Sequence, residues 1–507
     1  MAKDDENIER WDLTGSVSPF LDRHMMFPLL EYLDSLINGG AFKSYSTKDV
    51  ATARLSLLRP THMVDYAIDI YQSLHPEVKG VPKELEEQKS AVYKNLEELR
   101  AGCKKFDELC RSAEERTKLV TSGGWNATAV ASSHGITSET LETYRRLAKF
   151  NFECGDYQAS RTMLTNYISL FAKPPPPSDD DGDDDALNLN PNAPKSSKEK
   201  DNADVGNPVI YYLESVTLDL LSVLWGKLAA DILVEDWEAA RVAVDAVKAG
   251  LESLVSSKKI SALKALQQRT WLLHWSLFVY WNVPHGLEHM VELFHSERYK
   301  QAITTNAPHL LRYLTAAVLL CKRRISKKSS QSSESRRLMK NLINVMQDCE
   351  YTDPIVEFVH NLCVRYDFDQ AQLKLAECEA VLDADFFLCK QTALFMEEAR
   401  VFVFEHYCRI HHKIHLEALG EKLAMDSESA EKWMVDLIRN ADLDAKIDNN
   451  CVVMGNTQEA QSIHQQVMER TRDLNVRSAT LAQNLQSVLQ DARKEQAKKN
   501  TRRDDDY

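Results

Sequence analysis

Four side chains with metal-binding chemistry lie close together in the stretch EHYCRIHHKIH, residues 405–415. They are Cys408, His411, His412 and His415, and Cys and His are the ligands of structural zinc sites. If the stretch is helical, Cys408, one of the two central histidines and His415 share one face. A single helix rarely supplies a tetrahedral ligand set, however, and the sequence nearby holds no second Cys/His cluster. We therefore interpret the stretch as a histidine-rich helix at a domain junction and predict no metal site.

The acidic run SDDDGDDD, residues 178–185, has a composition that suits calcium. With Gly182 at the turn position of an EF-hand loop, Pro177 stands at the first ligand position and Asn188 stands where a bidentate Glu is needed. The run belongs to a segment, 173–207, that begins with KPPPP and has almost no large apolar side chains. Such a segment cannot bury enough surface to offset the entropy of ordering. We predict a disordered insert without bound calcium.

Signatures of catalysis and of export are absent from the sequence. It contains no glycine-rich phosphate-binding loop and no G-x-S-x-G motif. The ten cysteines include no C-x-x-C pair, which is typical of reduced intracellular thiols. The chain begins with the charged residues MAKDDENIER, and no apolar run approaches the roughly 18 residues of a membrane span. We predict a cytoplasmic protein that is not an enzyme, holds no cofactor and does not enter a membrane.

The size and charge of the chain limit its partners. Its 507 residues suggest about three domains, and 44% hydrophobic residues suffice for real cores. The formal charge is −14, and an acidic protein repels a phosphate backbone unless its cations are concentrated in a patch. Binding of nucleic acid by the whole surface is therefore not expected.

Helical periodicity dominates the chain. In FLDRHMMFPLLEYLDSL, residues 20–36, apolar side chains recur at three- and four-residue spacing. Elsewhere an aromatic residue follows a polar turn and a small residue comes three positions later: Tyr157 with Ser160, Trp237 with Ala240, Tyr299 with Ala302, and Phe368 with Ala371. The ring can fill the wedge between two helices while the small residue lets the backbones approach. The irregular spacing of these pairs indicates a divergent solenoid, with chance placement in ordinary helices as the alternative.

A helix followed by two short strands is predicted for EKWMVDLIRNADLDAKIDNNCVVMG, residues 431–455. The apolar residues of the first half share a helical face, residues 445–448 alternate, and an Asn-Asn turn leads to Val452, Val453 and Met454. This is the plan of a winged helix, a module that many proteins use to bind DNA. Residues 426–440 carry more acidic than basic side chains, however, which disfavours DNA. We predict a winged helix that binds protein through an exposed strand edge.

A long terminal helix is predicted from about residue 458 to 496, because the stretch QSIHQQVMERTRDLNVRSATLAQNLQSVLQ lacks Pro and Gly. Its apolar residues recur every seven positions, which favours packing in a coiled-coil-like bundle. The solenoid and the winged helix can close their own cores without it. We therefore predict a partner interface made of Val452, Val453, Met454, Val467, Leu474, Leu481, Leu485 and Val488.

A helical-repeat array that runs into a winged helix and a terminal helix resembles the PCI-domain proteins of the proteasome lid, the signalosome and eukaryotic translation initiation factor three. Within that group, long stretches resemble the family of e-type subunits of the initiation factor. They are FLDRHMMFPLLEYL, MVDYAIDIYQSL, YRRLAKFNFECGDY, LWGKLAADILVEDWEAA, QQRTWLLHWSLFVYWN, PHLLRYLTAAV, ARVFVFEHYCRIH and DLIRNADLDAKID. These stretches are spread from residue 20 to 450, so the resemblance covers nearly the whole folded chain.

The resemblance implies a non-catalytic scaffold that acts in assembly of the small-ribosomal-subunit preinitiation complex and in mRNA recruitment, through PCI–PCI and helix-bundle contacts. It implies the other PCI and MPN subunits as partners, the 40S subunit through the complex, and a hetero-oligomer. A PCI scaffold of the proteasome lid or signalosome is one alternative, which the quoted stretches disfavour. A DNA-binding winged-helix regulator is another, but it would need a basic recognition helix.

The resulting prediction is a mainly α fold: a TPR/HEAT-like helical-repeat solenoid that leads into a winged helix (together a PCI domain), then a long C-terminal helix. We expect an N-terminal helical-repeat region over 1–172 and the insert over 173–207. The repeat part of the PCI domain follows over 208–405, the winged helix over 406–457, and the terminal helix with a charged tail over 458–507.

One further segment departs from the helical pattern. KRRISKKSSQSSESRR, residues 322–337, is basic and rich in serine. We predict a solvated loop, with phosphorylation or contact with ribosomal RNA as alternatives.

Overall fold

The computed structural model describes residues 9–40, 42, 45–77, 80, 82–122, 124–173, 212–213, 216–327 and 332–410. It also describes residues 413–415, 445–448 and 451–454, positions 432 and 435, and helical positions between 467 and 489. The predicted insert lies outside the described residues apart from Lys173. The chain divides into two compact units, residues 1–403 and 404–507.

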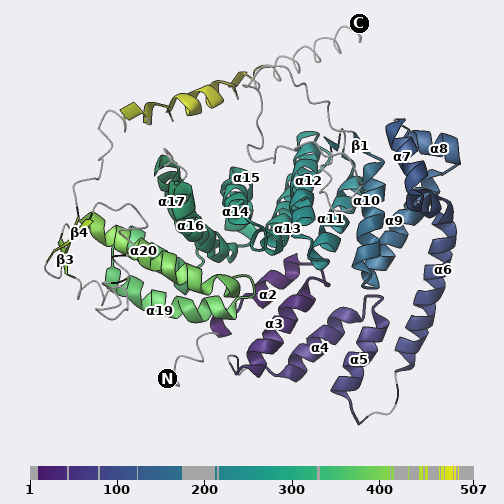
Figure 1. The fold of residues 1–507 in the computed structure, drawn as a ribbon, viewed down its shortest axis with the longest axis horizontal. Coiled ribbons are helices and arrows are strands. Elements are labelled where there is room, and N and C mark those ends of the chain that lie inside the picture. Colours follow the sequence, from purple (N-terminus) through teal and green to yellow (C-terminus); the bar gives the residue numbers. More distant parts are fainter. Residues whose placement is uncertain are drawn as a thin grey trace, which may run out of the picture. The chain divides into compact units, whose positions relative to one another are not determined.

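Helices build the first unit, and consecutive helices pack side by side along the chain (Figure 1). Before the insert come η1 (Glu9–Trp11), α2 (Thr14–Val17), η2 (Ser18–Phe20), α3 (Met26–Asn38), α4 (Thr47–Leu58), α5 (Val64–Leu74), α6 (Lys83–Arg111), α7 (Ala113–Thr121), α8 (Ala127–His134), α9 (Ser138–Glu153) and α10 (Tyr157–Ser169). After it come α11 (Leu218–Leu233), α12 (Trp237–Ser256), α13 (Ala262–Tyr280), α14 (Gly286–His295), α15 (Glu297–Asn306), α16 (Leu310–Lys327), α17 (Ser332–Asp348), α18 (Pro354–His360), η3 (Asn361–Arg365), α19 (Phe368–Ala384), η4 (Cys389–Gln391) and α20 (Thr392–Ile410). The predicted mainly α, repeat-like fold is confirmed.

The second unit contains the predicted wing. β3 (Lys413–His415), β4 (Ala445–Asp448) and β5 (Cys451–Met454) form an antiparallel sheet in the order β3-β5-β4. β4 and β5 are the two predicted strands, and β3 is a third that the sequence pattern does not indicate. The described positions between 467 and 489 are helical, as predicted for the terminal helix.

A shared turn introduces three helices of the first unit. In each copy, a residue with positive φ precedes an Asp, and an aromatic residue then opens the helix. The copies are Gly155-Asp156-Tyr157 before α10, Glu235-Asp236-Trp237 before α12, and Tyr366-Asp367-Phe368 before α19. Each Asp carboxylate accepts the backbone N–H three residues further on, which satisfies a donor that the helix start leaves unpaired.

The small residue of each predicted pair is fully buried. Ser160, Ala240, Ala302 and Ala371 are all 0% exposed. Their aromatic partners open α10, α12 and α19 and lie in the first turn of α15. A small, fully buried side chain lets a neighbouring helix approach, and consecutive helices do pack against each other, as a repeat array requires.

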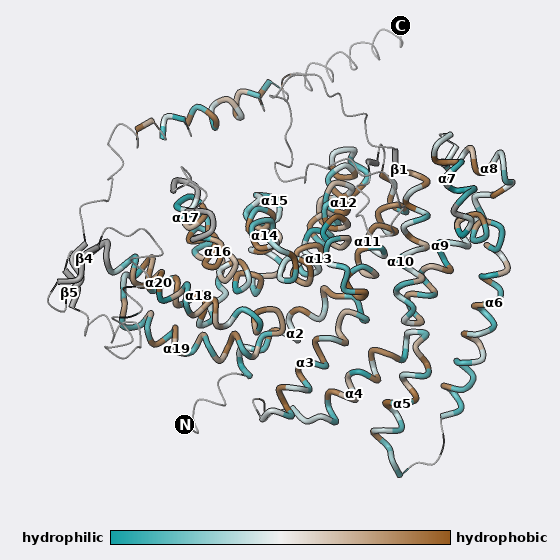
Figure 2. The backbone as a smooth tube through the Cα atoms, viewed as in Figure 1, coloured by the Kyte–Doolittle hydropathy of each residue, from teal (hydrophilic) through white to brown (hydrophobic). Residues whose placement is uncertain are grey.

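The hydropathy of α6 changes along its length. All of its buried residues, Cys103, Phe106, Leu109 and Cys110, lie in the C-terminal half. The N-terminal half is largely hydrophilic (Figure 2). Only the second half of this long helix therefore contributes to the core of the array.

Two expectations about local structure are wrong. Segment 322–337 is mostly helical, because α16 continues to Lys327 and α17 begins at Ser332. Its Lys and Arg residues are good helix formers, and helical packing on both sides outweighs the serines. The histidine-rich stretch is not one helix, because α20 ends at Ile410 and β3 begins at Lys413.

That second correction removes the shared helical face that a zinc site would need. Cys408 lies in α20 and His415 in β3, whereas His411 and His412 lie outside the described residues. Pairing of β3 with β5 places Ile414 opposite Val452, so sheet formation overrides the helical pattern of the stretch.

The described residues on the two sides of the insert pair with each other. β1 (Ala172–Lys173) pairs antiparallel with β2 (Tyr212–Leu213). Beside this ladder α10 packs against α11, and Arg161 of α10 forms ion pairs with Asp231 and Asp236. The helical array therefore continues across the insert.

Deleting residues 176–205 should leave folding and assembly nearly unchanged. The β1–β2 ladder and the Arg161 ion pairs remain, and shortening a loop changes its closure free energy by only about 0.6 kcal/mol per halving of length. Differential scanning calorimetry should find a melting temperature within about 3 °C of the wild type. A larger drop, or loss of co-purifying partners, would show that the insert is structural.

Candidate functional site

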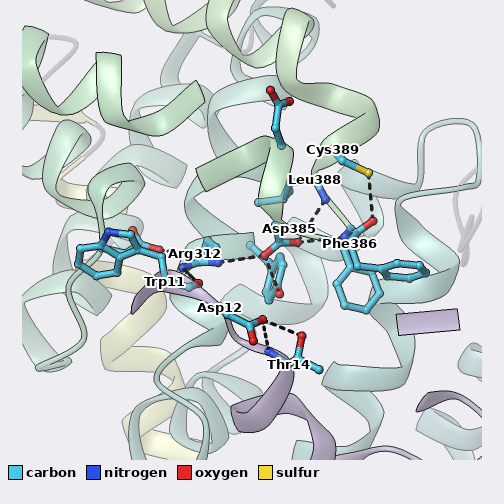
Figure 3. Close-up of polar contacts among 12 residues, drawn as sticks. Trp11, Asp12, Thr14, Arg312, Asp385, Phe386, Leu388 and Cys389 are labelled. Carbon is cyan, nitrogen blue, oxygen red and sulfur yellow. Dashed lines mark hydrogen bonds and ion pairs between the residues drawn. The ribbon is translucent and has the colours of Figure 1, made fainter. Parts of the chain in front are cut away.

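A buried arginine joins remote segments of the first unit (Figure 3). Arg312 of α16 is 1% exposed, and its guanidinium donates to Asp353 Oδ2 at 2.7 Å and to Asp385 Oδ2 at 3.0 Å. A third bond, of 2.8 Å, goes to the backbone oxygen of Trp11. Asp353 caps the N-terminus of α18, and Asp385 is the residue after α19. We call Arg312, Asp353, Asp385 and Trp11 the Arg312 clasp.

Both carboxylates of the clasp accept several further hydrogen bonds. The donors are Val356 N–H and Tyr351 O–H to Asp353, and Phe387 N–H, Leu388 N–H and Tyr313 O–H to Asp385. Burial lowers the pKa of Arg312, but Asp353 and Asp385 outweigh it and raise that pKa well above the ordinary value. Burial raises the pKa of Asp385, and Arg312 opposes the rise. The clasp is thus a compensated buried ion cluster of structural character.

The N-terminal segment is held to distant helices at further points. The indole N–H of Trp275 in α13 donates to the Phe20 carbonyl at 3.0 Å. The Tyr32 hydroxyl donates to the Asp383 carbonyl at 2.6 Å. Together with the Arg312 clasp, these bonds fasten η1, η2 and α3 against α13, α16 and α19, and the purple and green helices lie beside each other in Figure 1.

Two neutral histidines lie under the same segment. His274 Nε2 and His309 Nε2 are 2.8 Å apart, and His274 Nδ1 is 2.7 Å from the carbonyl oxygen of Thr270. Because a carbonyl only accepts, Nδ1 of His274 carries the proton and its Nε2 accepts from His309. Burial lowers the pKa of His274 to about 3 and that of His309 to about 4. The ring of Phe20 stacks on this neutral pair, with its centroid 4.4 Å from that of His274.

The chemistry of these clusters points to structure rather than to catalysis. The cavity beside the clasp, lined by Trp11, Tyr32, Arg312 and Phe386 among others, is about 20 Å³, room for about one water molecule. Within the part of the chain that the structure describes, no group of three His, Cys, Asp or Glu side chains is placed to hold a metal ion. No helix in the same ranges is long and apolar enough to cross a membrane.

The wing offers backbone groups along two edges. β5 is the central strand, with both of its sides paired to β3 and β4. The outer sides of β3 and β4 have no strand partner among the described strands, so their N–H and C=O groups are available to an added strand. The predicted residues Val452, Val453 and Met454 lie in β5, whose backbone is paired on both sides.

The terminal helix exposes large apolar side chains. Val467, Leu474, Leu481 and Leu485 are between 55% and 62% exposed. Val488 lies outside the described residues. With roughly 100° between successive residues, these four positions, which we call the seam, fall within about 40° of one another around the helix, and Val476 falls on the opposite side. An apolar stripe of this kind suits packing against another helix.

The chain matches two protein-family models. Residues 12–151 match the family described as eIF3 subunit 6 N terminal domain, and residues 375–456 match the PCI domain. The second match ends two residues beyond β5, so it covers the wing.

Proteins named as the E subunit of eukaryotic translation initiation factor 3 are similar to the chain over nearly its full length. The Bombyx mori protein is 34% identical over 484 residues, which are 94% of this chain and 95% of that protein. The Arabidopsis thaliana protein is 33% identical over 497 residues, 95% of this chain and 98% of the relative. The Drosophila erecta protein is 34% identical over 483 residues, which are 94% of this chain and 95% of that protein.

Replacing Arg312 by Met should destabilise the protein by about 3–5 kcal/mol, because Asp353 and Asp385 would stay buried without their cation. Guanidinium unfolding measures the loss. Arg111→Met is the matched control, since it removes the exposed arginine of an Arg–Asp pair, and it should leave the midpoint nearly unchanged. Adding Asp353→Asn and Asp385→Asn to Arg312→Met should restore part of the stability. A midpoint of Arg312→Met equal to that of the control would contradict the role of the clasp.

The histidine pair predicts a loss of stability on acidification. Folded pKa values of about 3 and 4 lie below the unfolded value of about 6.5, so below pH 6.5 the unfolded chain binds more protons. Each histidine should then cost about 1.4 kcal/mol per pH unit as the pH falls from 6.5 toward 4. His309→Gln keeps a donor toward His274 and should flatten this slope in unfolding measured from pH 7 to 5. His289→Gln, at an exposed position, should not.

Proposed function

Because the chain belongs to the family of E subunits of eukaryotic translation initiation factor 3, we propose that it is a non-catalytic scaffold subunit of that initiation factor. The observation that carries the proposal is the identity of 33–34% over at least 94% of the chain, with both the N-terminal domain and the PCI domain matched. The subunit acts in assembly of the preinitiation complex on the small ribosomal subunit and in mRNA recruitment. It works in the cytoplasm, without DNA, membrane or cofactor.

The arrangement of buried groups supports a rigid support rather than an enzyme. The Arg312 clasp and the histidine pair use their hydrogen bonds to join segments of the chain, and the cavity beside the clasp is too small for a substrate. Polar clusters that are satisfied internally give a fixed shape. A fixed shape is what a subunit needs if several neighbours are to bind it at once.

The partners in this proposal are other PCI and MPN subunits, bound in a hetero-oligomer, and the 40S subunit is reached through the complex. Sheet edges β3 and β4 are suited to strand addition by a neighbouring PCI subunit. The acidic winged helix is unsuited to a phosphate backbone, which supports a protein partner.

The terminal helix supplies the second contact. Burying Val467, Leu474, Leu481 and Leu485 against partner helices contributes roughly 1.5–3 kcal/mol each before ordering costs. An isolated helix of this kind draws little stability from itself, so it needs such packing. Seam and sheet edges together form the proposed interface.

Sedimentation of cell extract tests the assembly that we propose. The protein should travel with initiation complexes of 40S size or larger and should co-purify with other initiation factor 3 subunits. Finding it only with proteasome or signalosome particles would support the alternative PCI scaffold and overturn this proposal.

Replacing Leu474, Leu481 and Leu485 together by Asp should give a soluble, helical protein that no longer co-purifies with its neighbours, because the charges lie on the seam. The matched control is Val476→Asp with Ala479→Asp and Gln483→Asp, which puts the same charge on the opposite side of the helix. Affinity capture followed by quantification of each partner separates the seam variant from the control variant. Circular dichroism checks that both variants are folded. If the triple Asp variant captures its partners as well as the wild type does, the seam is not the anchor, and the sheet edges of the wing carry the interface.

A further inference from the structure

A group of exposed lysines lies at the turn between α12 and α13. These two helices pack side by side (Figure 1), and Arg269 Nε of α13 lies 3.0 Å from Glu252 Oε1 of α12. They therefore form a hairpin, and residues 257–261 make its turn. Three lysines and one leucine lie in this turn and at the start of α13. We call them the α12–α13 corner: Lys258, Lys259, Leu263 and Lys264.

The three ammonium groups of the corner have no carboxylate partner. Lys258, Lys259 and Lys264 are exposed, and none of them forms an ion pair with a residue that the structure describes. Residues 253–287 contain no Asp or Glu, although 76 of the 507 residues of the chain are acidic. Glu252, just before this range, is already bound by two arginines of α13 and α15. The corner therefore keeps three uncompensated positive charges.

Local stability does not explain two of these lysines. Lys258 has a φ of +56° just after α12, where glycine is usual because it adopts this conformation without strain. Lys264 stands three residues after Ser261, the N-cap of α13. A Glu at that position would complete a capping box and would suit the positive end of the helix dipole. Because another residue would be more stable at both positions, the charge of these lysines points to a role outside the fold.

Leu263 adds an apolar side chain next to these charges. It is 79% exposed, which is the largest exposed fraction of any large hydrophobic side chain among the described residues. An aliphatic side chain gains nothing from a phosphate backbone, and residues 253–264 contain no aromatic ring on which a base could stack. A leucine among lysines suits a peptide that presents carboxylates and apolar side chains together.

We propose that the α12–α13 corner binds an acidic segment of a partner protein, one in which Asp or Glu residues flank large apolar side chains. The lysines attract the carboxylates, and Leu263 packs against an apolar side chain of the segment. Salt weakens the first contribution and leaves the second. The corner shares no residue with the seam or the wing, so this contact goes beyond the proposed scaffold interface.

The test uses the purified full chain and a fluorescein-labelled peptide of 15 residues. The peptide consists of Asp and Glu with Leu or Phe at every fourth position. Fluorescence anisotropy gives its dissociation constant from 50 to 300 mM salt. A second peptide, with Ser in place of each Leu and Phe, should bind about fivefold more weakly, because it offers nothing to Leu263.

The double variant Lys258→Gly with Lys264→Glu should lose at least about tenfold in affinity at 50 mM salt, because it changes the charge of the corner by three units. It should melt at or above the wild-type temperature, since Gly suits the positive φ and Glu completes the capping box. Loss of binding by a protein of equal or higher stability excludes misfolding as the cause. Replacing all three lysines by Arg should keep the affinity within about threefold.

The variant Leu263→Gln tests the apolar contact separately. It should lose about fivefold in affinity and keep the wild-type salt dependence, because the charges remain. Leu373→Gln is its matched control, at a position of α19 that is 60% exposed. Lys94→Gln with Lys105→Glu is the matched control for charge, at exposed positions of α6. Both controls should change the affinity by less than about twofold.

Four results would overturn the proposal. The first is wild-type protein without saturable peptide binding at 50 mM salt, and the second is an equal loss in the double variant and the α6 control. The third is a 20-nucleotide uridine RNA that binds more tightly than the peptide and is lost in the double variant, which would assign the corner to nucleic acid. The fourth is peptide binding only after deletion of residues 176–205, which would assign the corner to the chain's own acidic run SDDDGDDD.

Discussion

The Arg312 guanidinium is the constraint on which the first unit depends. A cation with 1% exposure is tolerable only where its partners are in place, and those partners come from the N-terminal segment, the cap of α18 and the residue after α19. A divergent helical array has mainly nearest-neighbour contacts, so its ends are free to vary in angle. The clasp adds contacts between residues 41, 73 and 301 positions apart, and these fix the array as one body.

What the sequence predicts well is what local chemistry determines. An Asp before an aromatic residue caps a helix at each of three turns, and a small residue three positions later marks a close helix contact, so the pattern is readable without the structure. The strands β4 and β5 follow from alternation around an Asn-Asn turn. The clasp has no such signal, because Arg312, Asp353 and Asp385 are each ordinary residues in their own segments. The sequence also gives no sign that His274 and His309 are neutral, since their pKa values depend on burial under Phe20.

Two local errors have one physical cause, namely that packing outweighs local composition. The serines of segment 322–337 suggest a loop, yet most of it lies in α16 and α17. The reverse holds at the histidine-rich stretch, where a helical pattern gives way to β3 because β5 offers a ladder. A three-residue strand carries too little periodicity to be recognised, so its partner is what defines it.

The division between folding and binding follows from where the apolar surface lies. Residues of the first unit bury their large side chains in the helical array and use polar clusters to fix its shape. The terminal helix does the opposite, because Val467, Leu474, Leu481 and Leu485 stay more than half exposed in the isolated chain. Apolar area exposed in this way lowers solubility unless it is covered. The first unit buries its apolar side chains within the chain itself, whereas the terminal helix leaves them exposed. The chain is therefore suited to fold first and then to cover the terminal helix by binding neighbouring subunits.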